Sequence, residues 1–181
     1  MTAQQVQPEP AESKAQQFGI RIEKVVVNIG VGKSGEQLEK AKAVLRSITG
    51  VQKVWERKAK RTIRDFGVRE NESIAVAVTL RRQAAEELLG RAFKAANMKL
   101  KASSVSGRTF SIGLVEHILL PGSRYDPKLG VFGMDIAVTL ERPGYRVARR
   151  KRRPSKIGKG AGISSQDTID FISSKYGVEV V

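Results

Sequence analysis

Two stretches of strict alternation constrain the fold of this chain more than any other feature. Residues 73–81 and 133–141 each place an apolar side chain at every second position. The apolar positions are Ile74, Val76, Val78 and Leu80 in the first stretch and Met134, Ile136, Val138 and Leu140 in the second. A strand buried on both faces has a continuous apolar run, whereas a strand in a sheet covered on one face alternates. The pattern predicts a two-layer α+β fold, a mainly antiparallel sheet with helices on one face and the other face open.

The remaining elements follow from helical periodicity and from turn residues. We expect strands at 20–29, 51–55 and 110–115, helices at 82–96 and 165–176, and loops at 57–69 and 101–109. A further helix is predicted to begin at an N-cap, Ser34, and to end at Gly50. Residues 1–17 have little to bury and are expected to be a disordered lead-in, which leaves residues 18–181 as a single domain with its last helix at 165–176.

Positive charge is concentrated in two segments of the chain. The sequence has 33 Lys and Arg residues against 18 Asp and Glu residues, a net charge of +15. Residues 142–159 contain nine basic residues and no acidic one, and residues 53–69 contain seven against two, so these segments carry 14 of the net charges. Such concentration indicates a polyanionic partner, although a single basic run can also be a solvated tail or a localisation signal.

Aromatic residues beside the basic segments favour nucleic acid as that partner, since bases stack on aromatic rings. They are Trp55, Phe66 and Tyr145; Trp55 can equally be a core residue at the end of a strand. The small and polar side chains of the open sheet face would let RNA approach closely, which makes that face the RNA-facing side. An ordinary solvated face is the alternative.

Several functional classes are excluded or disfavoured by composition. The chain has no cysteine and one histidine, His117, which rules out disulfides, thiolate metal sites and sites that need two histidines. An isolated histidine is more often structural than catalytic. No apolar run is long enough to cross a bilayer. We therefore expect a cytoplasmic protein that is not an enzyme and has no cofactor, metal site or membrane partner.

The competing interpretation is a dinucleotide- or nucleotide-binding enzyme, and it rests on the glycine-rich segment Gly30–Gly35. This segment fits the G-x-G-x-x-G pattern of dinucleotide-binding enzymes, and its Gly32-Lys33-Ser34 resembles the end of a phosphate-binding loop. It follows a predicted strand, opens a predicted helix and has Glu56 near the right distance for a ribose. That fold, however, requires a parallel sheet covered on both faces. The alternating strands argue against it, and a structural turn is the simpler interpretation.

Six motifs in a fixed order resemble the large-subunit ribosomal protein L-five family. They are KVVVNIGVG at 24–32, KAKRT at 58–62, VTLR at 78–81, FSIG at 110–113, GMDI at 133–136 and ERPGYRVARR at 141–150. The last one resembles the archaeal and eukaryotic branch. The similarity covers about residues 20–181, and its strength lies in the combination, since each motif alone is weak.

The resemblance implies a structural protein of the ribosomal central protuberance. It would bind 5S rRNA and other large-subunit rRNA, beside a neighbouring 5S-binding protein and facing a small-subunit head protein. Family members hold RNA with the sheet and its edges, and the matching positions here are Asn28, Gln52, Thr79 and Arg81.

Two further sets of residues complete the expected sites. In the family, a loop after the KAKRT motif reaches the P-site tRNA. It corresponds here to Thr62, Ile63, Arg64, Asp65, Phe66, Gly67, Val68 and Arg69. From the basic segments we expect rRNA phosphate contacts by Lys58, Lys60, Arg61, Arg146, Arg149 and Arg150.

Overall fold

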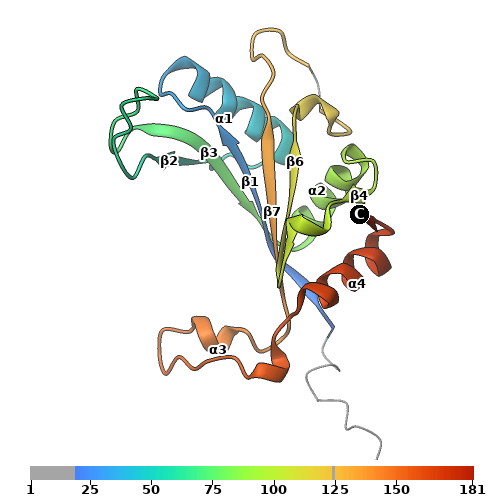
Figure 1. Ribbon diagram of the computed structural model, residues 1–181. Coiled ribbons are helices and arrows are strands. Elements are labelled where there is room, and N and C mark those ends of the chain that lie inside the picture. The colour runs from blue at the N-terminus through green and yellow to red at the C-terminus, as the bar shows by residue number, and fades with distance from the viewer. Residues whose placement is uncertain (1–18, 124) are drawn as a thin grey trace, which may run out of the picture.

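The computed structural model describes residues 19–123 and 125–181, so the lead-in predicted for residues 1–17 lies outside the described residues. Six strands form one antiparallel sheet in the order β2-β3-β1-β7-β6-β5 (Figure 1). The strands are β1 (Arg21–Gly30), β2 (Trp55–Lys58), β3 (Ser73–Leu80), β5 (Val105–Ser106), β6 (Thr109–Leu114) and β7 (Met134–Glu141). A second, parallel pair consists of β4 (Lys99–Leu100) and β8 (Glu179–Val180).

Four helices and three short 3₁₀ turns connect the strands. The helices are α1 (Glu36–Thr49), α2 (Arg82–Ala95), α3 (Arg146–Arg149) and α4 (Ser165–Tyr176). The 3₁₀ turns are η1 (Ala102–Ser104), η2 (His117–Leu119) and η3 (Lys159–Ala161). Within the described ranges, no helix has the length and apolar character that a bilayer crossing requires.

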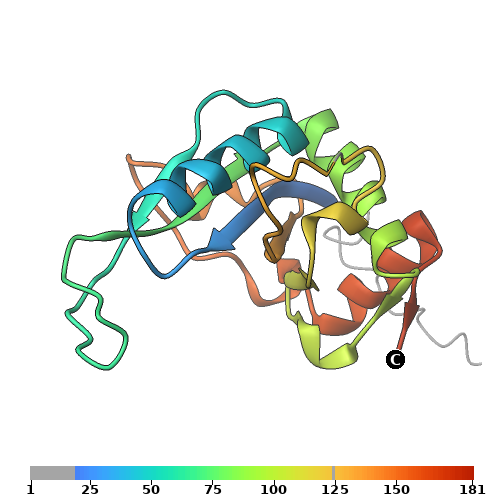
Figure 2. The ribbon, with the colours of Figure 1, turned by 90° about the horizontal axis from the view of Figure 1, so that it is seen from above.

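One face of the sheet is buried and the other is free, as the alternation predicts. The apolar side chains of β1, β3, β6 and β7 pack beneath α1 and α2, which lie on the same side of the strands (Figure 2). On the opposite side of the same strands, Thr79, Ser111, Asp135 and Ala137 are exposed. The predicted two-layer α+β fold is therefore confirmed.

Local boundaries differ from the predictions at several places, and the loop predicted at 101–109 contains η1, β5 and the first residue of β6. Gly35, not Ser34, is the N-cap of α1, because the Ser34 hydroxyl donates instead to the Glu72 carboxylate at 2.6 Å. The short strand predicted at 51–55 begins only at Trp55, and its second half, Arg57 and Lys58, lies in the predicted loop 57–69. Gly50 ends α1 in the left-handed conformation, as expected.

The predicted helix at 165–176 is confirmed, and it closes the far edge of the core. Ser164 and Asp167 form a capping box at its start. At its end, the Tyr176 ring lies 5.1 Å from the Phe93 ring of α2, and Ile172 is fully buried. Burial and the nearby Glu86 carboxylate raise the pKa of the Tyr176 phenol to about 12.

This pKa predicts a loss of stability at alkaline pH. Between pH of about 10, where an unfolded tyrosine ionises, and about 12, the folded phenol stays protonated while the unfolded one loses its proton. The free energy of unfolding should fall across that window and be unaffected by this group at lower pH. Denaturant unfolding at a series of pH values measures it.

Tyr176→Phe should abolish that part of the pH dependence and also remove the late-titrating phenol from an ultraviolet absorbance titration. Because the hydroxyl is buried without a hydrogen-bond partner among the described residues, the same variant should change stability at neutral pH by less than about 1 kcal/mol. An unaltered alkaline profile in Tyr176→Phe would contradict the assignment.

Candidate nucleic-acid interface

The free side of the sheet, which we call the open face, consists of rows of side chains that run across the strands. The register aligns Trp55, Ala77, Asn28, Asp135 and Gly113 in one row across β2, β3, β1, β7 and β6. Neighbouring rows on one face are separated by about 7 Å, the advance of two residues along a strand. The row has a large aromatic residue at one end, polar groups in its middle and a glycine at the other end.

The next row is made of small side chains. It aligns Thr79, Val26, Ala137 and Ser111 across β3, β1, β7 and β6. Their size keeps the surface low, so that a bulky partner can approach the backbone. Asn28 and Thr79, two of the predicted site residues, therefore lie in adjacent rows of one surface.

The other two residues implied by the resemblance lie at the margins of the open face. Arg81 follows β3 and is exposed, and its guanidinium donates to the backbone oxygen of Glu23 at 3.5 Å. Gln52 is exposed in the connection between α1 and β2, where its backbone oxygen accepts a hydrogen bond from Arg46. The structure thus brings Asn28 and Thr79 together and leaves Gln52 outside the sheet.

Trp55 is a residue of the open face that the sequence could not distinguish from a core residue. It lies on the edge strand β2 and is 58% exposed. The Lys53 ammonium is 4.8 Å from the centre of its ring. Since Ala77 is its neighbour in the row, the indole borders a shallow surface on which a base could stack.

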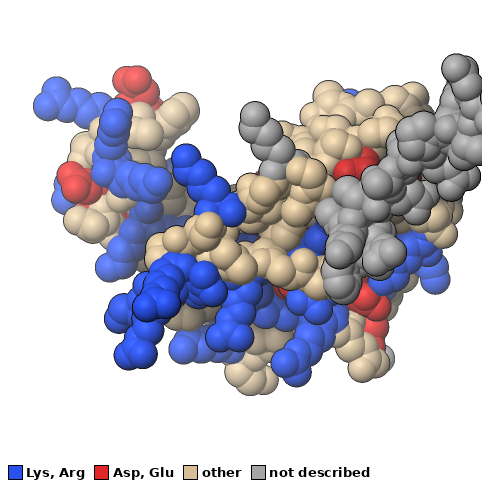
Figure 3. Space-filling view, turned by 90° about the horizontal axis from the view of Figure 1, so that it is seen from below, with Lys and Arg blue, Asp and Glu red and all other residues tan. Residues whose placement is uncertain are grey.

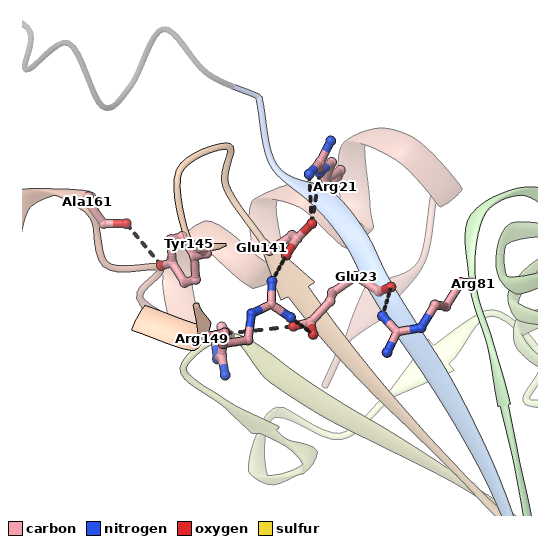
Figure 4. A network of polar contacts seen from close by, with 8 residues as sticks. Arg21, Glu23, Arg81, Glu141, Tyr145, Arg149 and Ala161 are labelled. Carbon is pink, nitrogen blue, oxygen red and sulfur yellow. Dashed lines mark hydrogen bonds and ion pairs between the residues drawn. The ribbon is translucent and has the colours of Figure 1, made fainter. Parts of the chain in front are cut away.

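The segment 142–164, which we call the arm, is attached to the sheet by an ionic network (Figure 4). The guanidinium of Arg149 lies between the carboxylates of Glu23 and Glu141 and bonds to both. Arg21 bonds to Glu141 from the other side at 2.8 Å. The two carboxylates are well buried, with side chains 5% and 11% exposed, whereas the side chain of Arg149 is 43% exposed. A bulge in β1 at Glu23 brings its side chain to this position.

Two residues of the arm face inward, so the segment is not a solvated tail. Arg142 is buried and pairs with Asp167 of α4 at 3.2 Å. Tyr145 is only 5% exposed and donates its hydroxyl to the backbone oxygen of Ala161, so it belongs to the core and not to a stacking surface. The cations of the arm that are exposed are Arg146, Arg149, Arg150, Lys151, Arg152, Arg153 and Lys156.

The segment 59–72, which we call the finger, is a structured projection between β2 and β3. Its base is closed by bonds from the Ala59 amide to the Glu72 oxygen and from the Asn71 amide to the Ala59 oxygen. Its tip is a hairpin in which Ile63 pairs with Val68 around a tight turn. The loop predicted here is thus ordered by its own hydrogen bonds, and it presents Lys60, Arg61, Arg64, Phe66 and Arg69 to solvent.

The finger and the arm form one cationic side of the molecule. Both extend to the left of the sheet in Figure 1. Seen from below, Lys and Arg side chains gather over the arm, and the finger carries cations together with some acidic side chains (Figure 3). With Lys58 of β2 also exposed, the predicted phosphate-binding residues are all accessible, although Arg149 is already paired with two carboxylates.

The glycine-rich turn does not have the geometry of a phosphate loop. The amides of Val31 and Gly32 both donate to the backbone oxygen of Ile74, at 2.9 and 2.8 Å, so they do not point toward a ligand. Glu56, the residue at ribose distance in that interpretation, pairs with Lys42 and accepts from Ser73. Together with the antiparallel sheet, these bonds contradict a dinucleotide site.

His117 has a structural role. It is 2% exposed, and its Nδ1 accepts a hydrogen bond from the Phe132 amide at 3.2 Å. Among the residues that the structure describes, no three His, Asp or Glu side chains come together as metal ligands would.

The network predicts different roles for two arginines on the same short helix. Arg149→Ala should lower the free energy of unfolding by about 1–3 kcal/mol, because Glu23 and Glu141 would keep desolvated charge with less compensation. Arg146→Ala, at an exposed position, should change it by less than about 0.5 kcal/mol. Urea unfolding of both variants measures the difference, and equal effects would contradict the proposed roles.

Comparison with known proteins shows which family the chain resembles. Residues 11–69 match the family described as ribosomal protein L5, and residues 73–169 match the model for the C-terminus of the same ribosomal family. The large ribosomal subunit protein uL5 of Sulfurisphaera tokodaii is 48% identical over 164 residues, which cover 90% of this chain and 92% of the relative. The protein of the same name from Pyrobaculum aerophilum is 50% identical over 162 residues, covering 89% and 90%, respectively.

A more distant relative extends the agreement. The large ribosomal subunit protein uL5 of Nanoarchaeum equitans is 44% identical over 163 residues, covering 90% of this chain and 96% of the relative. All three relatives are archaeal, in agreement with the branch that the arm motif resembles. The two segments that match the family models form one sheet: residues 11–69 provide β1 and β2, and residues 73–169 provide β3, β6 and β7. The resemblance drawn from the sequence is confirmed: the chain belongs to the ribosomal protein L5 family.

Proposed function

We propose that this protein is a non-enzymatic constituent of the large ribosomal subunit that holds 5S rRNA against its open face. The observation that carries the proposal is the combination of an exposed, low sheet surface with cationic projections beside it. Family membership supports the ribosomal assignment. Residues 18–181 would act as one RNA-binding domain in the ribosomes of the cytoplasm, a proposal supported by the single large sheet built from both family segments.

The affinity for RNA and the position of the RNA on the protein would be determined by different residues. Phosphates are neutralised by Lys58 of β2, by Lys60 and Arg61 at the base of the finger and by the exposed Lys and Arg of the arm, which gives a salt-dependent affinity that does not depend on sequence. Asn28 and Thr79 offer hydrogen-bonding groups to riboses or bases on the open face, and the exposed ring of Trp55 offers a stacking surface at its edge. Arg81 and Gln52 extend the contact to the margins.

The ionic network makes the open face compatible with a polyanion. Glu23 and Glu141 would repel phosphates if they were unpaired. Arg149 and Arg21 offset their charge and at the same time hold the arm beside the sheet. In this scheme Arg149 contributes to RNA binding mainly by neutralisation and positioning, and the freer Arg146 and Arg150 bind phosphates.

Further partners are assigned to the projections. The tip of the finger, residues 62–69, would reach the P-site tRNA, because it extends from the body and carries exposed cations. A neighbouring 5S-binding protein, other large-subunit rRNA and a small-subunit head protein are the partners that the family resemblance implies for the remaining surface.

Binding to 5S rRNA as a function of sodium chloride concentration tests the central proposal. Affinity should fall steeply with salt, and Arg150→Ala should reduce the slope of the log–log plot by about one unit. Affinity that is indifferent to salt would refute the proposal, as would equal affinity for duplex DNA of the same length in competition.

Negative charge introduced on the open face or at its margin should abolish binding of 5S rRNA without unfolding the protein. Thr79→Glu and Arg81→Glu place a carboxylate against the phosphates at exposed positions. Ala84→Glu and Lys94→Glu introduce the same changes at exposed positions of α2, on the helical side. These controls should keep most of the affinity, and circular dichroism should show all four variants to be folded. Wild-type affinity in the folded Thr79→Glu and Arg81→Glu variants would refute the assignment of the open face.

Replacing residues 62–69 by a short Gly/Ser linker should affect tRNA binding and 5S rRNA binding differently. The finger packs outside the main core, so 5S rRNA binding should be retained while tRNA binding to reconstituted large subunits weakens. Filter binding measures both. Loss of 5S rRNA binding would show that the tip of the finger also belongs to the 5S rRNA interface.

A further inference from the structure

An apolar cavity lies between the glycine-rich turn and the finger. Its volume is about 670 Å³, within the range of sites that hold small organic groups. The apolar side chains that line it are Val31, Ala59, Ile63, Phe66, Val68 and Ile74. Lys33, Lys60 and Arg61 complete the lining, so the site combines an apolar interior with cations.

The walls of this cavity are held in place by the bonds that exclude a phosphate loop. The Val31 and Gly32 amides bind the turn to Ile74 of β3. The Glu72 carboxylate then accepts hydrogen bonds from the Ser34 hydroxyl at 2.6 Å and from the Arg69 amide at 3.0 Å, which joins the turn to the finger. These hydrogen bonds lower the pKa of Glu72, the Ser34 hydroxyl being the largest cause. The cavity is therefore preformed.

The exposure of the apolar side chains indicates a binding role. Phe66 is 74% exposed and Ile63 is 44% exposed, at the tip of a finger whose other exposed side chains are mostly charged. Neither side chain closes the core, which lies under α1 and α2. A cavity with an apolar lining and few hydrogen-bonding groups would bind a flat hydrophobic group. It would not distinguish one nucleobase from another by hydrogen bonds.

We propose that this cavity receives one unstacked nucleobase of a bound RNA. Phe66 stacks on the base, and Lys33, Lys60 and Arg61 bind the phosphates on either side of it. Charge complementarity favours this occupant over an apolar side chain of a protein, because the three charged residues of the lining are all cations. The inference rests on the proposed RNA-binding function, but it concerns a site separate from the open face.

A double-mutant cycle between protein and RNA tests the proposal. The probes are two fluorescein-labelled heptanucleotides of abasic riboses, one of which carries a single central 2-aminopurine. At low salt the base should strengthen binding to the wild-type protein by about tenfold. Phe66→Ala should remove that gain, whereas the control Tyr125→Ala, at an exposed aromatic residue outside both the cavity lining and the strands of the sheet, should preserve it. The 2-aminopurine fluorescence should fall on binding to the wild type and not to Phe66→Ala.

Two more variants refine the result. Phe66→Leu keeps an apolar side chain without a ring and should retain part of the gain. Lys60→Ala should weaken both probes by the same factor, since it removes a phosphate contact and not a base contact. Because Phe66 and Lys60 are exposed, these variants should fold as the wild type does.

Either of two results would overturn the proposal: no gain from the base with the wild type, or an undiminished gain with Phe66→Ala. If, in addition, an acidic pentapeptide with one central phenylalanine binds in a manner that depends on Phe66, the cavity is a site for a protein side chain. Affinity for 5S rRNA, measured on the same variants, separates this outcome from the proposed function. If the protein fails to bind 5S rRNA but the 2-aminopurine still strengthens probe binding through Phe66, only the proposed role of the open face is refuted. If the protein binds 5S rRNA but the 2-aminopurine does not strengthen probe binding, only the proposed role of the cavity is refuted.

Discussion

One-sided burial of the sheet is the constraint on which the rest of the structure depends. β1 pairs with β3 and β7, and the three strands place Val27, Val78 and Ile136 beneath the helices. Because side chains alternate along a strand, this burial directs every intervening residue outward. A slip of one residue in register would bury Asn28 and expose the valines. The composition of the open face is thus determined by the same apolar contacts that stabilise the fold.

Basic residues that are neighbours in the sequence have separate functions in the arm. Arg142 is buried against Asp167, Arg149 offsets the charge of Glu23 and Glu141, and Arg146 faces solvent. A buried carboxylate is tolerated only when a cation compensates its lost hydration. Part of the positive charge of this segment is therefore used within the protein, and the exposed remainder forms the cationic side.

The glycine-rich turn has an architectural function. It crosses from β1 to α1 beside the finger, and its amides and the Ser34 hydroxyl are bonded to Ile74 and Glu72. The bonds that a phosphate would require are made within the chain. They stiffen the base of a projection that would otherwise depend on its own short hairpin, and they form one wall of the apolar cavity.

The sequence by itself determined the features that depend on local periodicity. The alternation at 73–81 and 133–141 was sufficient to predict a one-sided sheet, and Gly50 and Gly177 end helices because their left-handed backbone favours glycine. Asn28 and Thr79 could be placed on one surface for the same reason. Only the tertiary structure decided that Trp55 is exposed, that Tyr145 is buried, and that Arg142 and Arg149 are paired while Arg146 is free. Those outcomes depend on partners such as Glu23, Asp167 and Ala161, which approach only when distant segments fold together, so no local pattern records them.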